Sequence, residues 1–237
     1  MHNFEREFKQ VPVAVGLSVL LVVIYLAEAL RSGSLTIDMA TMYNFGGLVP
    51  AAVFAQNEWW RLLTAGFIHV SLTHMLLNVV VIYFIGRLLE MSLGSLQLAV
   101  LFLVGVIGGN LFAMLLGNVL VISLGASGGA FTLVGAIIYL GLRENRRGVW
   151  REQMQTMIIF VGMNVVFSLF DSSIGIWAHV GGFLMGLTLT GGLIQSRYAQ
   201  NTFKSSKTTT ILAYVSTAII LGALVFGVLT RLNGIFY

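Results

Sequence analysis

The chain contains no cysteine and only two prolines, and Asp, Glu, Lys and Arg make up 9% of its 237 residues. Without cysteine there is no disulfide framework, no thiol nucleophile and no thiolate metal site. The scarcity of charge, together with 57% apolar residues and a mean hydropathy of +0.92, excludes an ordinary soluble domain. Composition therefore predicts an all-α polytopic membrane protein.

Seven apolar runs are candidate membrane spans, each of which needs about 20 apolar residues. They cover residues 11–30, 62–86, 96–116, 127–142, 153–170, 176–194 and 211–230. The fourth run is too short to face lipid on all sides, so we expect it at the centre of the bundle. The first run contains Ala27-Glu28-Ala29, which mimics a signal-peptide cleavage site, but its length and Glu28 favour an uncleaved helix.

These runs divide the chain into four expected parts. The six-span core covers 11–196 and includes a long outer loop, 31–61, whose tryptophans suit the membrane interface. Residues 1–10 form a cytoplasmic N-terminal segment. Residues 197–210 form a cytoplasmic linker, and 211–237 form an accessory seventh helix.

Basic residues predict the orientation. With the N-terminus in the cytoplasm, ten Lys and Arg residues lie inside and three outside, as the positive-inside rule requires. Seven spans then place the C-terminus outside. The net charge of +4 is thus explained by topology, and no nucleic-acid partner is expected. The partner that surrounds the chain is the lipid bilayer, and a bacterial plasma membrane is the expected location.

The most distinctive stretch, LGASGGAF at residues 124–131, places Ser127 among glycines at the start of the fourth run. A serine at the mouth of a helix has an exposed hydroxyl, a close backbone approach and free N–H groups nearby. A nucleophile with an oxyanion hole needs those three features. The competing interpretation is that the glycines only let helices pack closely.

The second run carries polar residues that could serve such a site. His74 and Asn78 are four residues apart and therefore share one helix face. His69, five residues before His74, is expected to point elsewhere. Their spacing and the lack of a nearby carboxylate argue against a metal site, and no cofactor is expected.

The sixth run contains His179 on one helical stripe with Gly182 and Gly186. Ser127 shares a face of the fourth run with Phe131 and Gly135. If the two small-residue stripes pack together, His179 comes within hydrogen-bonding reach of Ser127 at the outer side of the membrane.

Taken in order, these residues resemble the rhomboid family of intramembrane serine proteases. The similarity extends from about Trp59 to Gly186. It consists of Trp60-Arg61, of His69 with His74 and Asn78, of Gly125-Ala126-Ser127-Gly128 with Gly135, and of Ala178-His179-Val180-Gly181-Gly182 with Gly186.

The resemblance implies a six-helix bundle with an extra C-terminal transmembrane helix. It implies that Ser127 is the nucleophile and His179 its general base. His74, Asn78 and the backbone N–H of Ser127 would form the oxyanion hole. Phe131 stands where the family often has Tyr, which keeps the packing surface without the hydroxyl.

The resemblance further implies a serine endopeptidase that cleaves single-span membrane proteins near the outer face. The nearest carboxylate, Asp171, is expected in a loop, so a Ser–His dyad is expected rather than a triad. Two alternatives remain. An inactive rhomboid-like binder would be expected to lack the serine or the histidine, and both are present. A small transporter with histidine proton relays would be expected to carry intramembrane carboxylates or a repeat.

Overall fold

The structure is a computed structural model that describes residues 9–144, 148–170, 175–195, 197–203 and 205–236. Within these ranges, six helices are long and apolar enough to cross a membrane. They are α2 (Pro12–Ser32), α6 (Leu72–Leu93), α7 (Ser95–Leu116), α9 (Val149–Phe170), α10 (Ile176–Leu193) and α12 (Lys207–Phe236). The predicted all-α polytopic membrane protein is confirmed.

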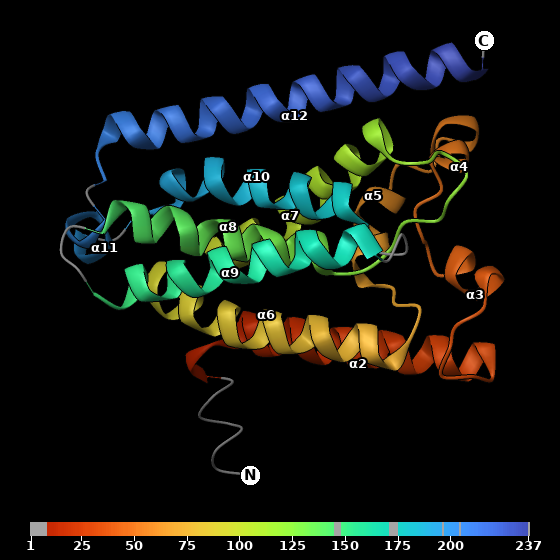
Figure 1. Cartoon of the computed structure of the whole chain (residues 1–237), viewed down its shortest axis with the longest axis horizontal. Helices are drawn as coiled ribbons and strands as arrows, with labels where there is room; N and C mark the ends of the chain where they lie inside the picture. Colours follow the sequence, from red (N-terminus) through yellow and green to blue (C-terminus); the bar gives the residue numbers. More distant parts are fainter. Residues whose placement is uncertain (1–8, 145–147, 171–174, 196, 204, 237) are drawn as a thin grey trace.

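A seventh, shorter apolar helix, α8 (Ser127–Arg143), lies at the centre of the bundle. It packs against α10, α7, α9 and α6 (Figure 1), and most of its residues are buried. Surrounding helices therefore shield it from lipid, as its shortness predicted. Its central position makes Ser127, its first residue, the point at which several other helices can place side chains.

Glycines allow α8 and α10 to touch along their backbones. A β-carbon on Gly182 would collide with the carbonyl oxygen of Gly128, and one on Gly186 would collide with that of Thr132. The hydroxyl of Thr132 donates to the Gly182 carbonyl at 2.7 Å and to the Gly128 carbonyl at 3.0 Å. The expected packing of the two small-residue stripes is confirmed, and we call this contact the glycine seam.

The second apolar run does not form one helix from residue 62. It is divided into α5 (Arg61–Thr64), a short 3-10 turn at Ala65–Phe67, an extended connection and then α6. The hydroxyl of Ser71 accepts from the backbone N–H of His74 and caps the new helix. His69 therefore precedes the membrane-spanning helix.

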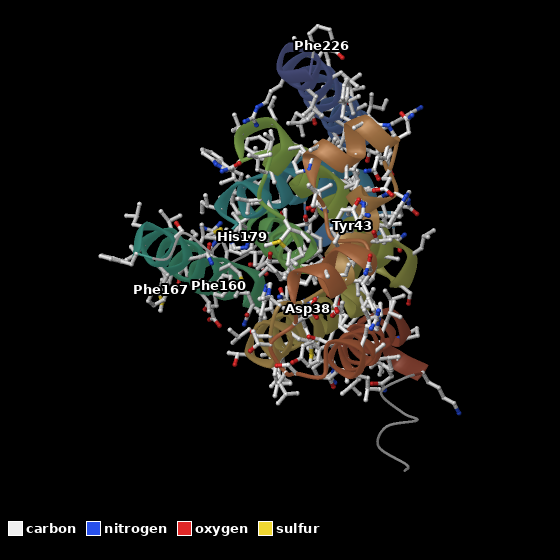
Figure 2. All side chains as sticks on the ribbon, turned by 90° about the vertical axis from the view of Figure 1, so that its right-hand side faces the viewer. Asp38, Tyr43, Phe160, Phe167, His179 and Phe226 are labelled. Carbon is white, nitrogen blue, oxygen red and sulfur yellow. The ribbon has the colours of Figure 1, made fainter. Side chains whose placement is uncertain are left out.

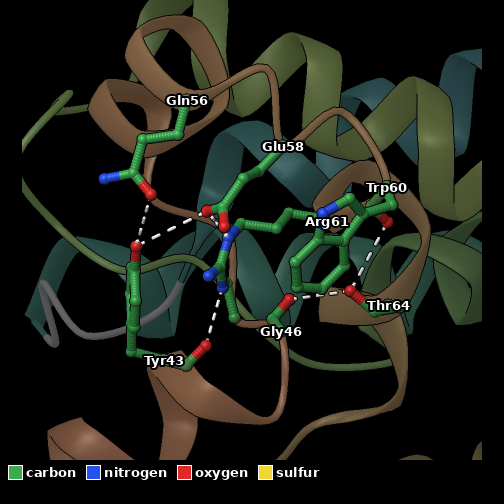
Figure 3. A network of polar contacts seen from close by, with 8 residues as sticks. Tyr43, Gly46, Gln56, Glu58, Trp60, Arg61 and Thr64 are labelled. Carbon is green, nitrogen blue, oxygen red and sulfur yellow. Dashed lines mark hydrogen bonds and ion pairs between the residues drawn. The ribbon is translucent and has the colours of Figure 1, made fainter.

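The outer loop is ordered by a buried arginine. Arg61 is 3% exposed, forms an ion pair with Glu58 at 2.7 Å and donates to the carbonyl oxygens of Tyr43 and Gly47 (Figure 3). Its guanidinium also lies over the rings of Tyr43 and Trp60. Tyr43 belongs to the short helix α3 (Met39–Asn44), and its hydroxyl also lies 3.4 Å from the Oε1 atom of Gln56 in the next short helix, α4 (Pro50–Gln56).

The helix α12 lies along the outside of the bundle against α10 and α7 (Figure 1). Near its end, Arg231 donates to the carbonyl oxygens of Met114, Leu115 and Gly117. Carbonyl groups at the end of a helix such as α7 lack partners within the helix, and the guanidinium supplies them. The small helix α11 (Arg197–Thr202) and the start of α2 lie at one end of the bundle, and α3, α4 and the end of α12 lie at the other. This arrangement agrees with an odd number of crossings.

Candidate functional site

Ser127 is the first residue of α8 and follows a turn whose backbone conformation only glycine adopts easily. Gly125 has a φ of 115°, and its N–H donates to the carbonyl of Ala65 at 2.8 Å. No side chain caps the helix at Ala126, so backbone N–H groups at this end keep unused donor capacity. Ser127 is half-buried, which leaves part of it open to approach.

His74 lies next to this turn. A β-carbon on Gly125 would be 2.9 Å from the Nε2 atom of His74 and 3.8 Å from the Oγ atom of Ser127. The imidazole and the hydroxyl thus border the same small space beside Gly125. The expectation that the ring of His69 points away from His74 is wrong. The two rings pack edge to face, 5.0 Å apart, because His69 lies in the connection before α6 rather than on the helix.

His69 is fully buried and serves the backbone. The Nε2 atom of its ring accepts from the backbone N–H of Ala126 at 3.4 Å, and the backbone N–H of His69 donates to the carboxyl group of Glu28 at 3.3 Å. These bonds join α2, the connection before α6 and the residue that precedes Ser127. His69 is therefore a support of the site and not a group that faces it.

Asn78 lies one turn below His74 on the same helix and is buried. One of its amide hydrogens is donated to the His74 carbonyl at 3.0 Å. An amide nitrogen carries two hydrogens, so Asn78 has one further hydrogen to donate.

His179 lies in the first turn of α10 and is 8% exposed. Its ring stacks on that of Phe131 at a centroid distance of 4.3 Å with 7° between the planes. Phe131 is one turn after Ser127 on α8, so the stacked imidazole lies on the Ser127 face of that helix. Looking from the end that carries α3 and α4, Figure 2 shows His179 in the interior of the bundle.

The backbones of α7, α8 and α10 also lie close together next to Ser127 and His179. A β-carbon on Gly109 of α7 would be 2.7 Å from the Ala178 carbonyl and 3.3 Å from the Gly128 α-carbon. Three helices thus meet beside Ser127 and His179. Among the hydrogen bonds of the described residues, none joins these two side chains. Such bonds are often long before substrate binds, so proximity is the informative observation.

Two residues of the site were missed by sequence reasoning. Asn164 on α9 contacts the Nδ1 atom of His179 through its Oδ1 atom at 2.9 Å. Thr132 bridges the glycine seam. The rule that an intramembrane amide needs a partner could have identified Asn164 as a candidate from the sequence.

The remaining candidates for the site are the acidic residue Asp171 and possible metal ligands. Asp171 lies outside the described residues. Within the ranges that the structure covers, no three His, Cys, Asp or Glu side chains are grouped so that they could hold a metal ion.

Comparison with known proteins gives a consistent family. The family model described as the Rhomboid domain matches residues 56–196. The Bacillus subtilis protein YdcA, whose name describes it as a candidate rhomboid protease, is 28% identical over 82% of this chain and 95% of its own length. The Bacillus subtilis rhomboid protease GluP is 29% identical over 65% of this chain and 29% of its own length. The Arabidopsis thaliana inactive RHOMBOID-like protein 8 is 33% identical over 61% of this chain and 41% of its own length.

Proposed function

Because the chain belongs to the rhomboid family and is an integral multi-pass membrane protein, we propose that it is an intramembrane serine endopeptidase in which Ser127 and His179 form a catalytic dyad. One observation carries the proposal: His179 stacks on Phe131, one turn from Ser127, beside a seam where the helix backbones touch. A dyad without a carboxylate depends on its neighbours to orient the imidazole, and the stacking of His179 on Phe131 is a contact of that kind.

The reaction follows from the two side chains. The Oγ atom of Ser127 attacks the carbonyl carbon of a peptide bond while the Nε2 atom of His179 takes its proton. The tetrahedral intermediate collapses, the C–N bond breaks and His179 gives the proton to the leaving nitrogen. Water then attacks the ester carbon, His179 takes a proton from it, and the Ser127 oxygen leaves and recovers that proton. No net charge or atom is left on the enzyme.

The proposed reaction needs an oxyanion hole beside the serine. We propose that the backbone N–H of Ser127, the ring of His74 and the remaining hydrogen of Asn78 donate to the developing oxyanion. His74 borders the same space as the Ser127 hydroxyl. The free N–H groups at the start of α8 add the positive end of the helix dipole. One such donor is typically worth about 3–4 kcal/mol of transition-state stabilisation.

The substrates proposed are single-span membrane proteins cut near the outer face. A peptide bond within a lipid-embedded helix has its carbonyl hydrogen-bonded, so a substrate segment must unwind before attack. In this proposal residues 11–196 are the catalytic core, 211–237 are an accessory helix, and the chain lies in a bacterial plasma membrane with its N-terminus in the cytoplasm.

A cleavage assay with the purified protein in liposomes tests the proposal. Tagged single-span proteins are incubated with the wild type, Ser127→Ala and His179→Ala, and with Ser168→Ala as a control for loss of an exposed hydroxyl on α9. Cleavage by the wild type and Ser168→Ala, with loss of about 10⁴-fold or more in the other two, supports the dyad.

The opposite results are equally informative. Cleavage that persists in Ser127→Ala would refute the assignment of the nucleophile. A wild type that binds a panel of substrates without cutting any would instead favour the inactive class that one relative's name describes.

A further inference from the structure

An amide side chain stands on the helix that is least covered by the rest of the protein. Only 6% of the apolar stretch of α9 is buried, against 61% of that of α10. Asn164 lies in this stretch and is half-buried. An amide without a hydrogen-bond partner is costly at membrane depth. The group that Asn164 contacts therefore indicates why an amide is found at this position.

The partner is the imidazole of His179, and the contact between the two side chains determines which ring nitrogen carries the hydrogen. The Oδ1 atom of Asn164 lies 2.9 Å from the Nδ1 atom of His179. An amide oxygen can only accept, so Nδ1 carries the hydrogen. The Nε2 atom is then left with a lone pair, which is the tautomer that a general base facing Ser127 requires.

A second residue on the same face of α9 reaches the same place. Phe160 is one turn before Asn164, and its ring lies 5.7 Å from that of Phe131. Phe131 in turn covers one flat side of His179. The imidazole is therefore held on one side by a ring and at Nδ1 by the amide.

We propose that Asn164 is a positioning residue that fixes the tautomer and orientation of His179 in the proposed dyad. This inference rests on the proposed function. When Nε2 takes the proton of Ser127, the ring becomes a cation and its Nδ1–H bond to Oδ1 becomes charge-assisted. No proton leaves Nδ1.

A purely structural role makes different predictions. If Asn164 only joined α9 to α10, an apolar side chain of similar size would serve as well on a lipid-facing helix. Asn164→Leu keeps the volume and removes the acceptor, whereas Asn164→Asp keeps an acceptor at nearly the same place. Ser168→Ala, one turn further along α9, removes a hydroxyl that bonds only to its own helix.

The test measures kcat and KM on a tagged single-span substrate in liposomes, and thermal unfolding in detergent, for these variants. We expect Asn164→Leu to lower kcat about tenfold or more, with KM within about twofold and no loss of thermal stability. Asn164→Asp should recover kcat to within about threefold of the wild type, and Ser168→Ala should match it.

NMR of ¹⁵N-labelled histidines measures the tautomer of His179 directly. The chain has four histidines, so ¹⁵N-histidine labelling gives few signals, and that of His179 is the one lost in His179→Ala. We expect a protonated Nδ1 in the wild type and a mixture of tautomers in Asn164→Leu. Unchanged kcat and tautomer in Asn164→Leu, or an Asn164→Asp variant that is folded but as slow as Asn164→Leu, would overturn the proposal. A wild type that cleaves nothing would overturn the proposed function instead, so the two failures are distinguishable.

Discussion

The two sides of the site are built in opposite ways. On one side, α8 and α10 touch along the glycine seam, where no β-carbon fits at Gly182 or Gly186. On the other side, α9 lies at the edge of the bundle and is mostly exposed (Figure 2). A β-carbon on its Gly162 would have no other atom within 4 Å. The seam fixes where the backbones of Ser127 and His179 lie. The side chains of α9 and of Phe131 fix how the imidazole is turned.

This difference indicates that one pair of helices can set the position of the two residues while another helix sets the orientation of the imidazole. A close-packed seam tolerates almost no added volume, because interiors have few voids and respond to a single methyl group. A helix that faces lipid tolerates most apolar changes on its outer face. Substitutions of the same type on the two sides should therefore have very different effects.

The largest effect is expected from adding one methyl group to each side. Gly182→Ala places a β-carbon against the Gly128 carbonyl and should destabilise the protein by about 3 kcal/mol, the upper part of the usual range for overpacking. Gly162→Ala has open space and should be neutral or stabilising by up to about 1 kcal/mol. Unfolding of both variants in detergent measures the contrast. Equal stabilities would mean that the seam is not tightly packed.

A smaller effect, on turnover rather than folding, is expected from the ring that covers His179. Phe131→Leu removes the flat stacking surface but keeps an apolar side chain in this buried position, and it should lower kcat about tenfold, which corresponds to about 1.4 kcal/mol. Phe167→Leu makes the same change on the exposed face of α9 and should leave kcat unchanged. The comparison uses initial cleavage rates in liposomes. If both variants turn over alike, the stacking does not orient the base.

The smallest effect is expected from the hydroxyl that crosses the seam. Thr132→Val keeps the shape and removes the bond to the Gly182 carbonyl, so it should destabilise the protein by about 1 kcal/mol. Thr230→Val removes a hydroxyl bonded only within α12 and should change stability by less than that. If Thr132→Val is as stable as the wild type, the glycine seam is held by backbone packing alone.

The sequence was most informative where a physical rule acts on spacing. Glycine stripes at helical intervals predicted the seam between α8 and α10, and the shortness of the fourth run predicted its central position. Both predictions depend on one helix and its period, so they could be made without knowing how the other helices are arranged.

Irregular backbone was harder to predict. Hydropathy gave one span from residue 62, whereas α6 begins at Leu72 after a 3-10 turn and an extended connection. An apolar connection buried under other elements has the same composition as a membrane helix. The contact between His69 and His74 follows from that connection and was lost with it.

The contribution of α9 was missed for a different reason. Asn164 acts on a histidine 15 residues away on another helix, and nothing in its own helix identifies that partner. The relation exists only once α9 and α10 are placed side by side. Long-range pairs of this kind need tertiary structure, whereas stripes on one helix do not.

The central claim, that Ser127 is a nucleophile activated by His179, can be tested without knowing a substrate. The wild type, Ser127→Ala and His179→Ala are treated with a serine-directed fluorophosphonate in detergent, and the adduct is located by peptide mass mapping. We predict one adduct in the wild type, on Ser127, and none in either variant. An adduct on another residue, or equal labelling in all three proteins, would contradict the claim.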